Sequence, residues 1–337
     1  MSDKSKVKRP SRRTNGVGKK SMSSMREINE GVIGIFCADL HLTLNAPVWR
    51  SAEPDWLEAQ ARVLKEIFDL AEDYDCPVFI VGDMFDKAIV STELSNWIYE
   101  HISIPNIYAI PGQHDLPNHQ YDNIHKTGFR NLVNSNIIKE IKELSPIEFS
   151  NFIICGFPFD SEIVQLNYTT KKLKIAIIHE YIWTGNHHYP NAPDEAKLTG
   201  DKTQYIDRKW FGYDVIVYGD NHKGFMVGMG KTTVFNCGTL MRRKSDEINY
   251  KPQVGLLLES GKVVPHYLDI SEDKYIESDE IPVETEEELD MSSFMQELER
   301  LGKTALDFMD AMKQFLHAGK TSDEAKQIIL DAMEKKK

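Results

Sequence analysis

Five short segments contain the residues whose types and spacing could support chemistry. They are Asp39-Leu40-His41, Gly82–Asp86, Gly112–Asp115, His179 and Gly219–His222. Their candidate ligands are carboxylates, imidazoles and an amide, with no thiolate. Such a set suits Mn²⁺, iron or Zn²⁺ rather than a structural zinc held by cysteines. There are enough carboxylates for two ions that share one of them, an arrangement that activates water and clamps a phosphate ester. The chemistry predicted is metal-assisted hydrolysis of phosphate esters.

No segment is specific by itself. An Asp-x-His triplet occurs by chance, and a Gly-Asp pair after a strand is more often a turn than a ligand. One histidine after an apolar strand is more often part of the core. The combination carries the prediction, because the segments recur at intervals of about 30 to 65 residues and each falls at the end of a predicted strand. Side chains at the carboxyl ends of several strands converge on one edge of an open α/β sheet.

The strands that would position these segments are short apolar runs rich in Val, Ile and Phe, as buried strands are. Six such runs are Val32–Ala38, Pro77–Val81, Ile107–Ile110, Phe152–Cys155, Leu173–Ile178 and Val215–Tyr218. Apolar residues at helical spacing predict a helix from Trp56 to Tyr74 and another from about Thr92 to His101. Strands that alternate with helices predict a layered α/β domain. After Val215, four more runs suggest a meander: Phe225–Val227, Thr233–Phe235, Val254–Leu258 and Val263–Leu268.

The chain divides into four predicted regions. Residues 1–30 form a basic arm that is expected to be disordered, and residues 31–270 form a catalytic domain whose last part could be a capping subdomain. Residues 271–291 are an acidic, Pro-containing linker. Residues 292–337 form a helical module, in which Thr304 and the Thr321–Glu324 capping box begin helices. The arm could tether DNA or merely keep the chain soluble.

The formal net charge of −12 at first argues against a nucleic-acid partner. Its distribution weakens that objection. Residues 1–30 carry nine Lys and Arg against three Asp and Glu, a net of +6, whereas residues 270–300 carry twelve acidic and two basic residues, a net of −10. A nuclease whose metal ions neutralise the scissile phosphate needs only local positive charge along the path of the DNA.

The expected compartment is the cytoplasm. No apolar run approaches the roughly 20 residues that span a bilayer, and the N-terminus lacks the apolar core of a secretory signal. The four cysteines are far apart and lie in or beside apolar runs: Cys37, Cys76, Cys155 and Cys237. Their spacing is neither that of a metal site nor that of a disulfide framework, so buried free thiols in a reducing compartment are expected. No membrane partner is expected.

The series D-x-H, G-D-x-F-D, G-x-H-D, H and G-x-x-H resembles the calcineurin-like metallophosphoesterases. Within that superfamily the chain is most similar to the SbcD-like recombination nucleases, including phage-encoded ones. Residues Asn236–Leu240 resemble the N-P-G-S-hydrophobic turn of those nucleases. The resemblance covers about residues 32 to 270. It implies the metallophosphoesterase fold, an α/β architecture in which a layered β-sandwich is flanked by helices, followed here by a small C-terminal helical module.

The resemblance also implies two divalent ions and their ligands. Mn²⁺ is the expected metal and Mg²⁺ the alternative. Asp39, His41 and His222 would hold the first ion, Asp83 would bridge both, and His179 and Asp220 would hold the second. Gln113 would be a further metal ligand. Two of these residues depart from the family pattern, which usually has Asn in place of Gln113 and His in place of Asp220. The extra carboxylate of Asp220 should favour Mn²⁺ or Mg²⁺ over softer metals.

The same resemblance assigns the catalytic residues. His114 would face the scissile phosphate, where it could protonate the leaving oxygen or stabilise the transition state. Asp115 would orient the imidazole of His114. Arg242 and Arg243 could contact DNA phosphates, with an exposed basic cluster as the alternative interpretation.

The function implied is that of the nuclease subunit in an SbcCD-like recombination and repair complex, with exonuclease and endonuclease activity on DNA. Its partner would be an SMC-like ATPase, docked by the helices after residue 291, although these could equally pack on their own domain. A homodimer is also expected, in the host cytoplasm if the protein is phage-encoded. The alternatives are a stand-alone phosphomonoesterase or cyclic-nucleotide phosphodiesterase on the same fold, and a non-enzymatic subunit with a degenerate site.

Overall fold

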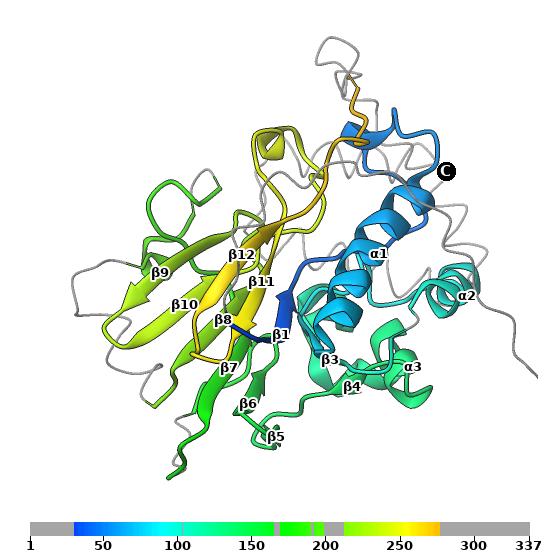
Figure 1. Ribbon diagram of the computed structural model, residues 1–337. Helices are drawn as coiled ribbons and strands as arrows, with labels where there is room; N and C mark the ends of the chain where they lie inside the picture. The colour runs from blue at the N-terminus through cyan, green and yellow to red at the C-terminus, as the bar shows by residue number, and fades with distance from the viewer. Residues whose placement is uncertain (1–29, 103, 165–168, 190–191, 199–211, 277–337) are drawn as a thin grey trace, which may run out of the picture. The chain divides into compact units, whose positions relative to one another are not determined.

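The computed structural model describes residues 30–102, 104–164, 169–189, 192–198 and 212–276. These residues form two six-stranded sheets that lie against each other, with helices on the outer face of the first sheet (Figure 1). Both sheets are mixed, because each contains four neighbouring parallel strands together with antiparallel pairs. The predicted α/β architecture, a layered β-sandwich flanked by helices, is therefore confirmed.

The first sheet has the strand order β12-β11-β1-β2-β3-β4. Its strands are β1 (Val32–Cys37), β2 (Val78–Val81), β3 (Ile107–Ile110), β4 (Lys139–Glu140), β11 (Gln253–Leu258) and β12 (Val263–Tyr267). β1 to β4 run parallel to one another, while β11 pairs antiparallel with β1 and with β12. The carboxyl ends of β1, β2 and β3 therefore meet at one edge.

The second sheet has the order β5-β6-β7-β8-β10-β9. Its strands are β5 (Ile147–Glu148), β6 (Phe152–Phe157), β7 (Leu173–His179), β8 (Val215–Gly219), β9 (Phe225–Met229) and β10 (Thr232–Asn236). β6, β7, β8 and β10 are parallel, and β9 is an antiparallel edge strand. The predicted meander after residue 215 is therefore wrong, because β10 pairs in parallel with β8 and the chain then returns to the first sheet as β11.

Three α-helices cover the first sheet: α1 (Trp56–Tyr74), α2 (Thr92–His101) and α3 (Gly128–Asn134). The side chain of Asp55 accepts a hydrogen bond from the Glu58 amide and so begins α1, and the left-handed backbone of Asp75 ends it. Ser91 caps α2 in the same way. Short 3₁₀ turns complete the description: η1 (Val48–Arg50), η2 (Gln113–Asp115), η3 (Pro117–His119), η4 (Tyr121–Lys126), η5 (Asp194–Ala196) and η6 (Ser245–Glu247).

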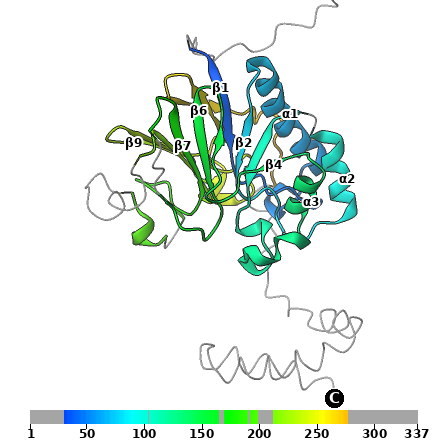
Figure 2. The same cartoon turned by 90° about the horizontal axis from the view of Figure 1, so that it is seen from below.

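Alternation along the strands builds the layers, because successive side chains of a strand point to opposite faces. In β1, Ile35 and Cys37 pack among the helices, whereas Phe36 packs between the two sheets. In β7, Ile177 joins the core between the sheets and Ile178 packs on the outer face of the second sheet. Figure 2 shows the resulting order, with β6 and β7 on one side of β1 and β2, and α1 on the other.

Contacts near the end of the described chain bear on one predicted boundary, the start of the acidic linker. Asp273 accepts hydrogen bonds from two buried arginines, and the Ile276 amide donates to the Trp49 carbonyl. The packed part of the chain therefore extends past residue 271, where the acidic linker was predicted to begin. Residues 1–29 of the basic arm and the helical module at 292–337 lie outside the described residues.

The four cysteines are buried free thiols, as predicted. Within the part of the chain that the structure describes, no helix is both long and apolar enough to cross a membrane.

Candidate metal centre

The candidate ligands meet where the parallel strands of both sheets end. Asp39 and His41 follow β1, Asp83 follows β2, His179 is the last residue of β7, and His222 follows β8. Four of them are almost completely buried, with 0% of Asp39, 2% of His41, 1% of Asp83 and 1% of His179 exposed. Burying carboxylates at this density is costly unless cations compensate them.

Two overlapping groups of ligand atoms share Asp39. Asp39, His41 and His222 each offer an atom within 4.8 Å of the others, and so do Asp39, Asp83 and His179. A third group of the same kind, His41, Asp86 and His114, lies at the exposed side of His41. Asp83 Oδ2 lies 3.4 Å from His179 Nε2 and 3.9 Å from His41 Nε2, so Asp83 stands between the groups. The grouping matches the predicted first set, Asp39, His41 and His222, and gives Asp39 a place in the second group as well.

The unsatisfied atoms of this cluster fit divalent cations. Asp83 Oδ2, His179 Nε2 and Gln113 Oε1 are buried, and none has a hydrogen-bond partner among the described residues. The Nε2 atoms of His41 and His222 face each other at 3.1 Å. Buried polar atoms are nearly always paired in native proteins, so several such atoms in one cluster indicate a missing partner. Carboxylate, imidazole and amide donors without thiolate are typical of Mn²⁺, iron or Zn²⁺ sites.

Hydrogen bonds behind the ligands fix their orientation. His179 Nδ1 donates to the Val81 carbonyl at 2.7 Å, which leaves Nε2 facing Asp83. His222 Nδ1 faces Glu247 Oε1 at 2.9 Å, which leaves Nε2 facing His41. A ring nitrogen held in this way selects the tautomer and the ring angle that suit a metal ligand.

Four candidate ligands have a left-handed backbone: φ is 53° at Asp39, 46° at His41, 50° at Asp83 and 78° at Asp220. This region costs non-glycine residues of order 1–3 kcal/mol each, and it persists only where the surrounding structure enforces it. Such backbone strain concentrates at functional sites.

Glycines allow the two sheets to close around His179. A Cβ on Gly112 would lie 2.6 Å from His179 Nε2 and closer still to the Asp83 carboxylate. Gly82 has a φ of +83°, and a Cβ there would overlap the His179 ring. The glycines of the G-D-x-F-D and G-x-H-D segments are therefore required by the space around the ligands.

We expect Gly112→Ala to lower both Mn²⁺ affinity and phosphodiester hydrolysis. Its methyl group would displace Asp83 or His179, and a displacement of about 1 Å at a reacting centre can cost about 100-fold. Isothermal titration with Mn²⁺ and hydrolysis of bis(p-nitrophenyl) phosphate would measure the two losses. Gly228→Ala on β9 is the matched control, because a Cβ there meets nothing within 4 Å. Equal behaviour of the two variants would contradict this packing.

The charges of the cluster set the pKa of each ligand. Burial alone would lower the pKa of His179, but the Asp83 carboxylate reverses this and raises the pKa to about 10. Burial raises the pKa of Asp39 to about 7, against the opposing influence of His179. Burial, followed by the neighbouring His222, lowers the pKa of His41 well below its usual value.

These pKa shifts predict that metal binding strengthens as the pH rises. A histidine ligand must be neutral, so at pH 8 an ion has to displace the proton that His179 carries. One displaced proton makes the affinity change about tenfold per pH unit, and the dependence steepens below pH 7, where Asp39 is also protonated. Titrations of Mn²⁺ in buffers of different ionisation enthalpy, between pH 6 and pH 8, would count the protons. Affinity that is independent of pH would contradict this assignment.

The two residues that depart from the family pattern contact each other. Gln113 Nε2 donates to Asp220 Oδ1 at 2.6 Å, while Gln113 Oε1 remains buried without a partner among the described residues. The Asp220 amide in turn donates to both carboxylate oxygens of Asp39, at 3.1 and 3.2 Å. Asp220 therefore lies beside Asp39, and Gln113 beside Asp220; that the two residues ligate a metal stays a prediction.

His114 lies beside the cluster and is exposed to solvent. Its ring centroid is 4.8 Å from that of His41, in an edge-to-face arrangement. Its Nδ1 faces the Asp86 carbonyl at 2.9 Å, and the His114 amide donates to Asp83 Oδ1 at 2.8 Å. Because Nδ1 is held, Nε2 is the atom left for a substrate.

The predicted role of Asp115 is wrong. Its buried carboxylate accepts hydrogen bonds from the backbone amides of Met84, Phe85 and Gly112, at 2.9 to 3.1 Å, and not from the His114 ring. Asp115 therefore ties the loop after β2 to the loop after β3, while the Asp86 carbonyl orients His114. The sequence could not distinguish these two partners, because Asp86 and Asp115 both belong to the predicted motifs.

The adjacent arginines differ in their surroundings. Arg242 is only 8% exposed, and its guanidinium donates to Asp273 and to the Ile248 carbonyl. Its burial fits neither predicted interpretation, a contact with DNA phosphates or an exposed basic cluster. Arg243 instead pairs with Asp86 at 2.7 Å, next to His114.

Arg242 belongs to a second buried polar cluster. Arg50 is fully buried and pairs with Glu53 and with Asp273, and the Tyr275 ring lies against the guanidinium groups of both arginines. This cluster anchors the segment after β12 to the turn before α1. It contains no candidate metal ligand.

Sequence analysis missed four residues that support the ligands. Glu247 contacts His222, Asp86 contacts His114, and the Thr239 hydroxyl donates to the Asp39 carbonyl. The fourth is Asn221, whose side-chain amide donates to the Ile182 and His187 carbonyls and thereby holds the loop after β7. Asp86, Asn221 and Thr239 lie inside or next to the recognised motifs, and this position was the only feature of the sequence that pointed to a role at the site.

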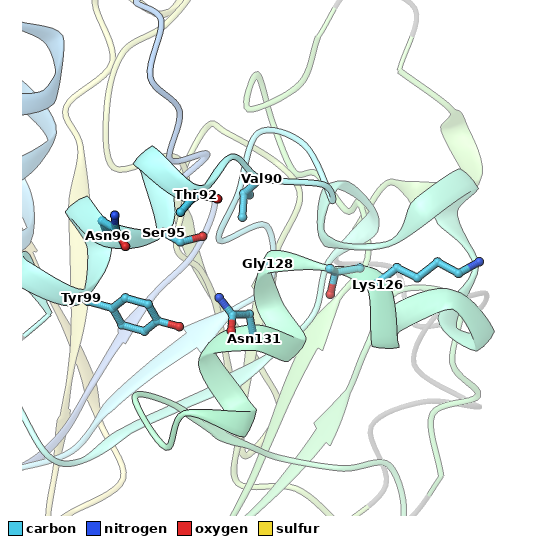
Figure 3. Close-up of a pocket in the computed structure, with 9 residues that line it drawn as sticks. Val90, Thr92, Ser95, Asn96, Tyr99, Lys126, Gly128 and Asn131 are labelled. Atoms are coloured by element: carbon cyan, nitrogen blue, oxygen red, sulfur yellow. The ribbon is translucent and has the colours of Figure 1, made fainter. Parts of the chain in front are cut away.

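A pocket elsewhere on the domain lies between α2 and α3 (Figure 3). Polar side chains line it, among them Ser95 and Tyr99 from α2 and Asn131 from α3. None of its lining residues is a candidate metal ligand.

Comparison with known proteins adds a family and several structural neighbours. A sequence model described as calcineurin-like phosphoesterase matches residues 35–224, more than half of the chain. No curated protein sequence matches the chain.

Three solved structures illustrate the structural likeness. TT1561 of Thermus thermophilus is 10% identical with a TM-score of 0.40, and the match covers 70% of this chain and 98% of that one. An archaeal phosphodiesterase is 14% identical with a TM-score of 0.33, covering 70% and 99%. A metallophosphoesterase from Sphaerobacter thermophilus is 11% identical with a TM-score of 0.36, covering 71% and 88%.

Proposed function

This chain belongs to the calcineurin-like phosphoesterase family, and we propose that within it the chain is a metal-dependent DNA nuclease. Membership makes it a metal-binding hydrolase of phosphoester bonds. The proposal goes further and assigns it to an SbcCD-like recombination or repair complex, as the nuclease subunit that works with an SMC-like ATPase. Mn²⁺ is the proposed metal.

One observation carries the hydrolytic part of the proposal: an exposed histidine stands beside a buried cluster of orphaned ligand atoms. Two divalent ions held by Asp39, His41, Asp83, His179 and His222, with Gln113 and Asp220, would activate water and offset charge on a phosphoryl group. His114 would then donate a proton from Nε2 to the leaving oxygen. The Asp86 carbonyl keeps that atom directed outward by holding Nδ1.

The local charge around the cluster supports a DNA substrate. Arg243 pairs with Asp86 beside His114, and Lys244 adjoins Glu247, the partner of His222. Lys223 follows His222 in sequence and donates to the His188 carbonyl. Arg243 is paired with Asp86 and Lys223 with Asp246, so the exposed Lys244 is the cation here that is suited to a phosphate flanking the scissile bond, in spite of the acidic average of the chain.

The partner and the location belong to the proposal as well. The helical spacing of apolar residues after 291 supports docking on an ATPase, and the basic arm supports contact with DNA. Four buried free thiols support a reducing compartment such as the cytoplasm. A homodimer is proposed on the resemblance alone.

A substrate comparison tests the proposal. Linear duplex DNA labelled at either end, single-stranded circular DNA and bis(p-nitrophenyl) phosphate should each be incubated with the full chain and Mn²⁺. We expect cleavage of DNA, with products that report the polarity and the type of end. Hydrolysis of small esters alone, with DNA intact whether or not an ATPase partner is added, would identify a phosphomonoesterase or cyclic-nucleotide phosphodiesterase instead.

A further inference from the structure

Glu247 is a buried carboxylate outside the ligand set that uses both of its oxygens at the site. Only 2% of it is exposed, and it ends the short η6 turn. Its Oε1 lies 2.9 Å from His222 Nδ1. Its Oε2 accepts hydrogen bonds from the amides of Arg243 at 2.6 Å and Lys244 at 3.0 Å. One side chain thus holds a candidate ligand and the backbone of the neighbouring turn.

A second series of contacts connects Glu247 with His114. The Arg243 amide rests on Glu247, and the Arg243 guanidinium pairs with Asp86 Oδ1 at 2.7 Å. The carbonyl of the same Asp86 faces His114 Nδ1 at 2.9 Å. A continuous path of contacts therefore connects Glu247 with His222 on one side and with His114 on the other.

We propose that Glu247 is a positioning residue that sets both the His222 ligand and, through Arg243 and Asp86, the His114 imidazole. The inference rests on the proposed metal-dependent hydrolysis and deepens it. It assigns to one carboxylate the mutual alignment of the metal ligands and of the group that protonates the leaving oxygen.

The effect on His222 follows from general metal-site chemistry. A carboxylate on one ring nitrogen keeps the proton there, orients the ring and makes the other nitrogen a better donor. Here the other nitrogen, Nε2, is the one that faces His41 at 3.1 Å. Without the carboxylate, the His222 ring can rotate or take the other tautomer, and metal affinity falls.

The effect on His114 depends on Arg243. Its side chain is 13% exposed and its Nε is buried without a hydrogen-bond partner among the described residues, so the pair with Asp86 is its main polar contact. If the turn at 243–247 moves, Arg243 no longer holds Asp86, and the carbonyl that orients His114 shifts. Loss of the contacts from Arg243 through Asp86 to His114 should therefore lower turnover at saturating metal and leave metal affinity unchanged.

A simpler role for Glu247 is to stabilise its own turn, since it accepts two amides there. That role predicts a lower melting temperature without a specific change in metal binding. Glu247→Gln separates the two roles, because glutamine keeps the size of the side chain but cannot accept from His222 and from both amides together.

The experiment compares Glu247→Gln with wild type in Mn²⁺ affinity, melting temperature and turnover of bis(p-nitrophenyl) phosphate at saturating Mn²⁺. Loss of a partner behind a metal ligand costs about 10- to 100-fold in affinity, and we expect this loss for Glu247→Gln. Turnover should stay about tenfold low when Mn²⁺ saturates, as expected when a catalytic group is misplaced. Asp246→Asn, an adjacent acid paired with Lys223, is the control and should match wild type.

Arg243→Met removes only the contacts that lead from Arg243 through Asp86 to His114. Mn²⁺ affinity should stay within about twofold of wild type, while turnover falls about tenfold with little change in KM. A rise in KM alone would instead mark Arg243 as a substrate contact and overturn the path to His114. If Glu247→Gln does not fold, Glu247→Asp takes its place, because the shorter carboxylate cannot span both branches.

Wild-type Mn²⁺ affinity and turnover in the Glu247 variants, with only a lower melting temperature, would overturn the inference. A wild-type chain that hydrolyses no phosphodiester would refute the proposed function instead. The Mn²⁺ titrations would still show in that case whether Glu247 supports His222, so the two failures are distinguishable.

Discussion

Replacing Asp83 by asparagine should reduce Mn²⁺ binding from about two ions to at most one and nearly abolish phosphodiester hydrolysis. Asp83 Oδ2 lies 3.4 Å from His179 Nε2 and 3.9 Å from His41 Nε2, so the substitution removes a carboxylate that joins ligands of the two groups. A pair of ions contributes several kcal/mol to transition-state stabilisation, and each 1.36 kcal/mol is tenfold in rate. The loss should therefore be about 10³-fold or more.

The measurement is metal content after dialysis, together with turnover of DNA and of bis(p-nitrophenyl) phosphate across a range of Mn²⁺ concentrations. Asp73→Asn on the exposed face of α1 is the matched control, since it removes the same charge at a residue that belongs to none of the candidate ligand groups. Metal content below about one ion per wild-type chain, with activity unchanged in Asp83→Asn, would support a non-enzymatic subunit rather than a two-ion hydrolase.

Local periodicity explains why the helices and strands could be predicted. The apolar stripe of α1 gave its bounds, Trp56–Tyr74, and nearly every apolar run became a strand within two residues of its predicted ends. The misses are short: β4 and β5 have two residues each, and α3 has seven residues and begins at a glycine. Elements of that length bury too little surface to leave a periodic pattern.

Strand partners were harder to predict than strands. β11 pairs with β1 across more than 200 residues, Val32 lying opposite Leu258. β10 lies between β8 and β9, parallel to β8 and antiparallel to its hairpin partner β9. Both pairings are decided by which faces the sheets must bury against each other, and a single apolar run does not contain that information.

The positions of the candidate ligands could be predicted because strand ends fix their location, whereas the residues behind them could not. His222 and Glu247 are separated by 25 residues and lie in different loops, and their contact appears only when both sheets have formed. The same is true of Arg242, which looked like an exposed base in sequence but pairs with Asp273 in the interior. Backbone strain at Asp39, His41 and Asp83 is likewise a product of the tertiary fold.

Replacing His114 by alanine should leave metal binding nearly intact and slow the hydrolysis of DNA by about 10²- to 10⁴-fold, the usual contribution of a positioned general acid. The reason is its position: the ring is exposed, its Nδ1 is held by the Asp86 carbonyl, and it packs edge-to-face against the His41 ring beside the cluster. His125→Ala, another exposed histidine, is the control and should match wild type.

The choice of leaving group sharpens this second prediction. A p-nitrophenolate leaves readily without a proton, whereas the alkoxide of a DNA strand does not, so a general acid matters more for DNA. His114→Ala should therefore lose much more activity on DNA than on bis(p-nitrophenyl) phosphate, at saturating Mn²⁺ for both. Equal losses on the two substrates would mean that His114 stabilises the phosphoryl oxygens instead of protonating the leaving group. A loss of Mn²⁺ from the His114→Ala protein would instead make His114 a ligand, and would remove the distinction between the buried cluster and the exposed imidazole on which the proposed chemistry depends.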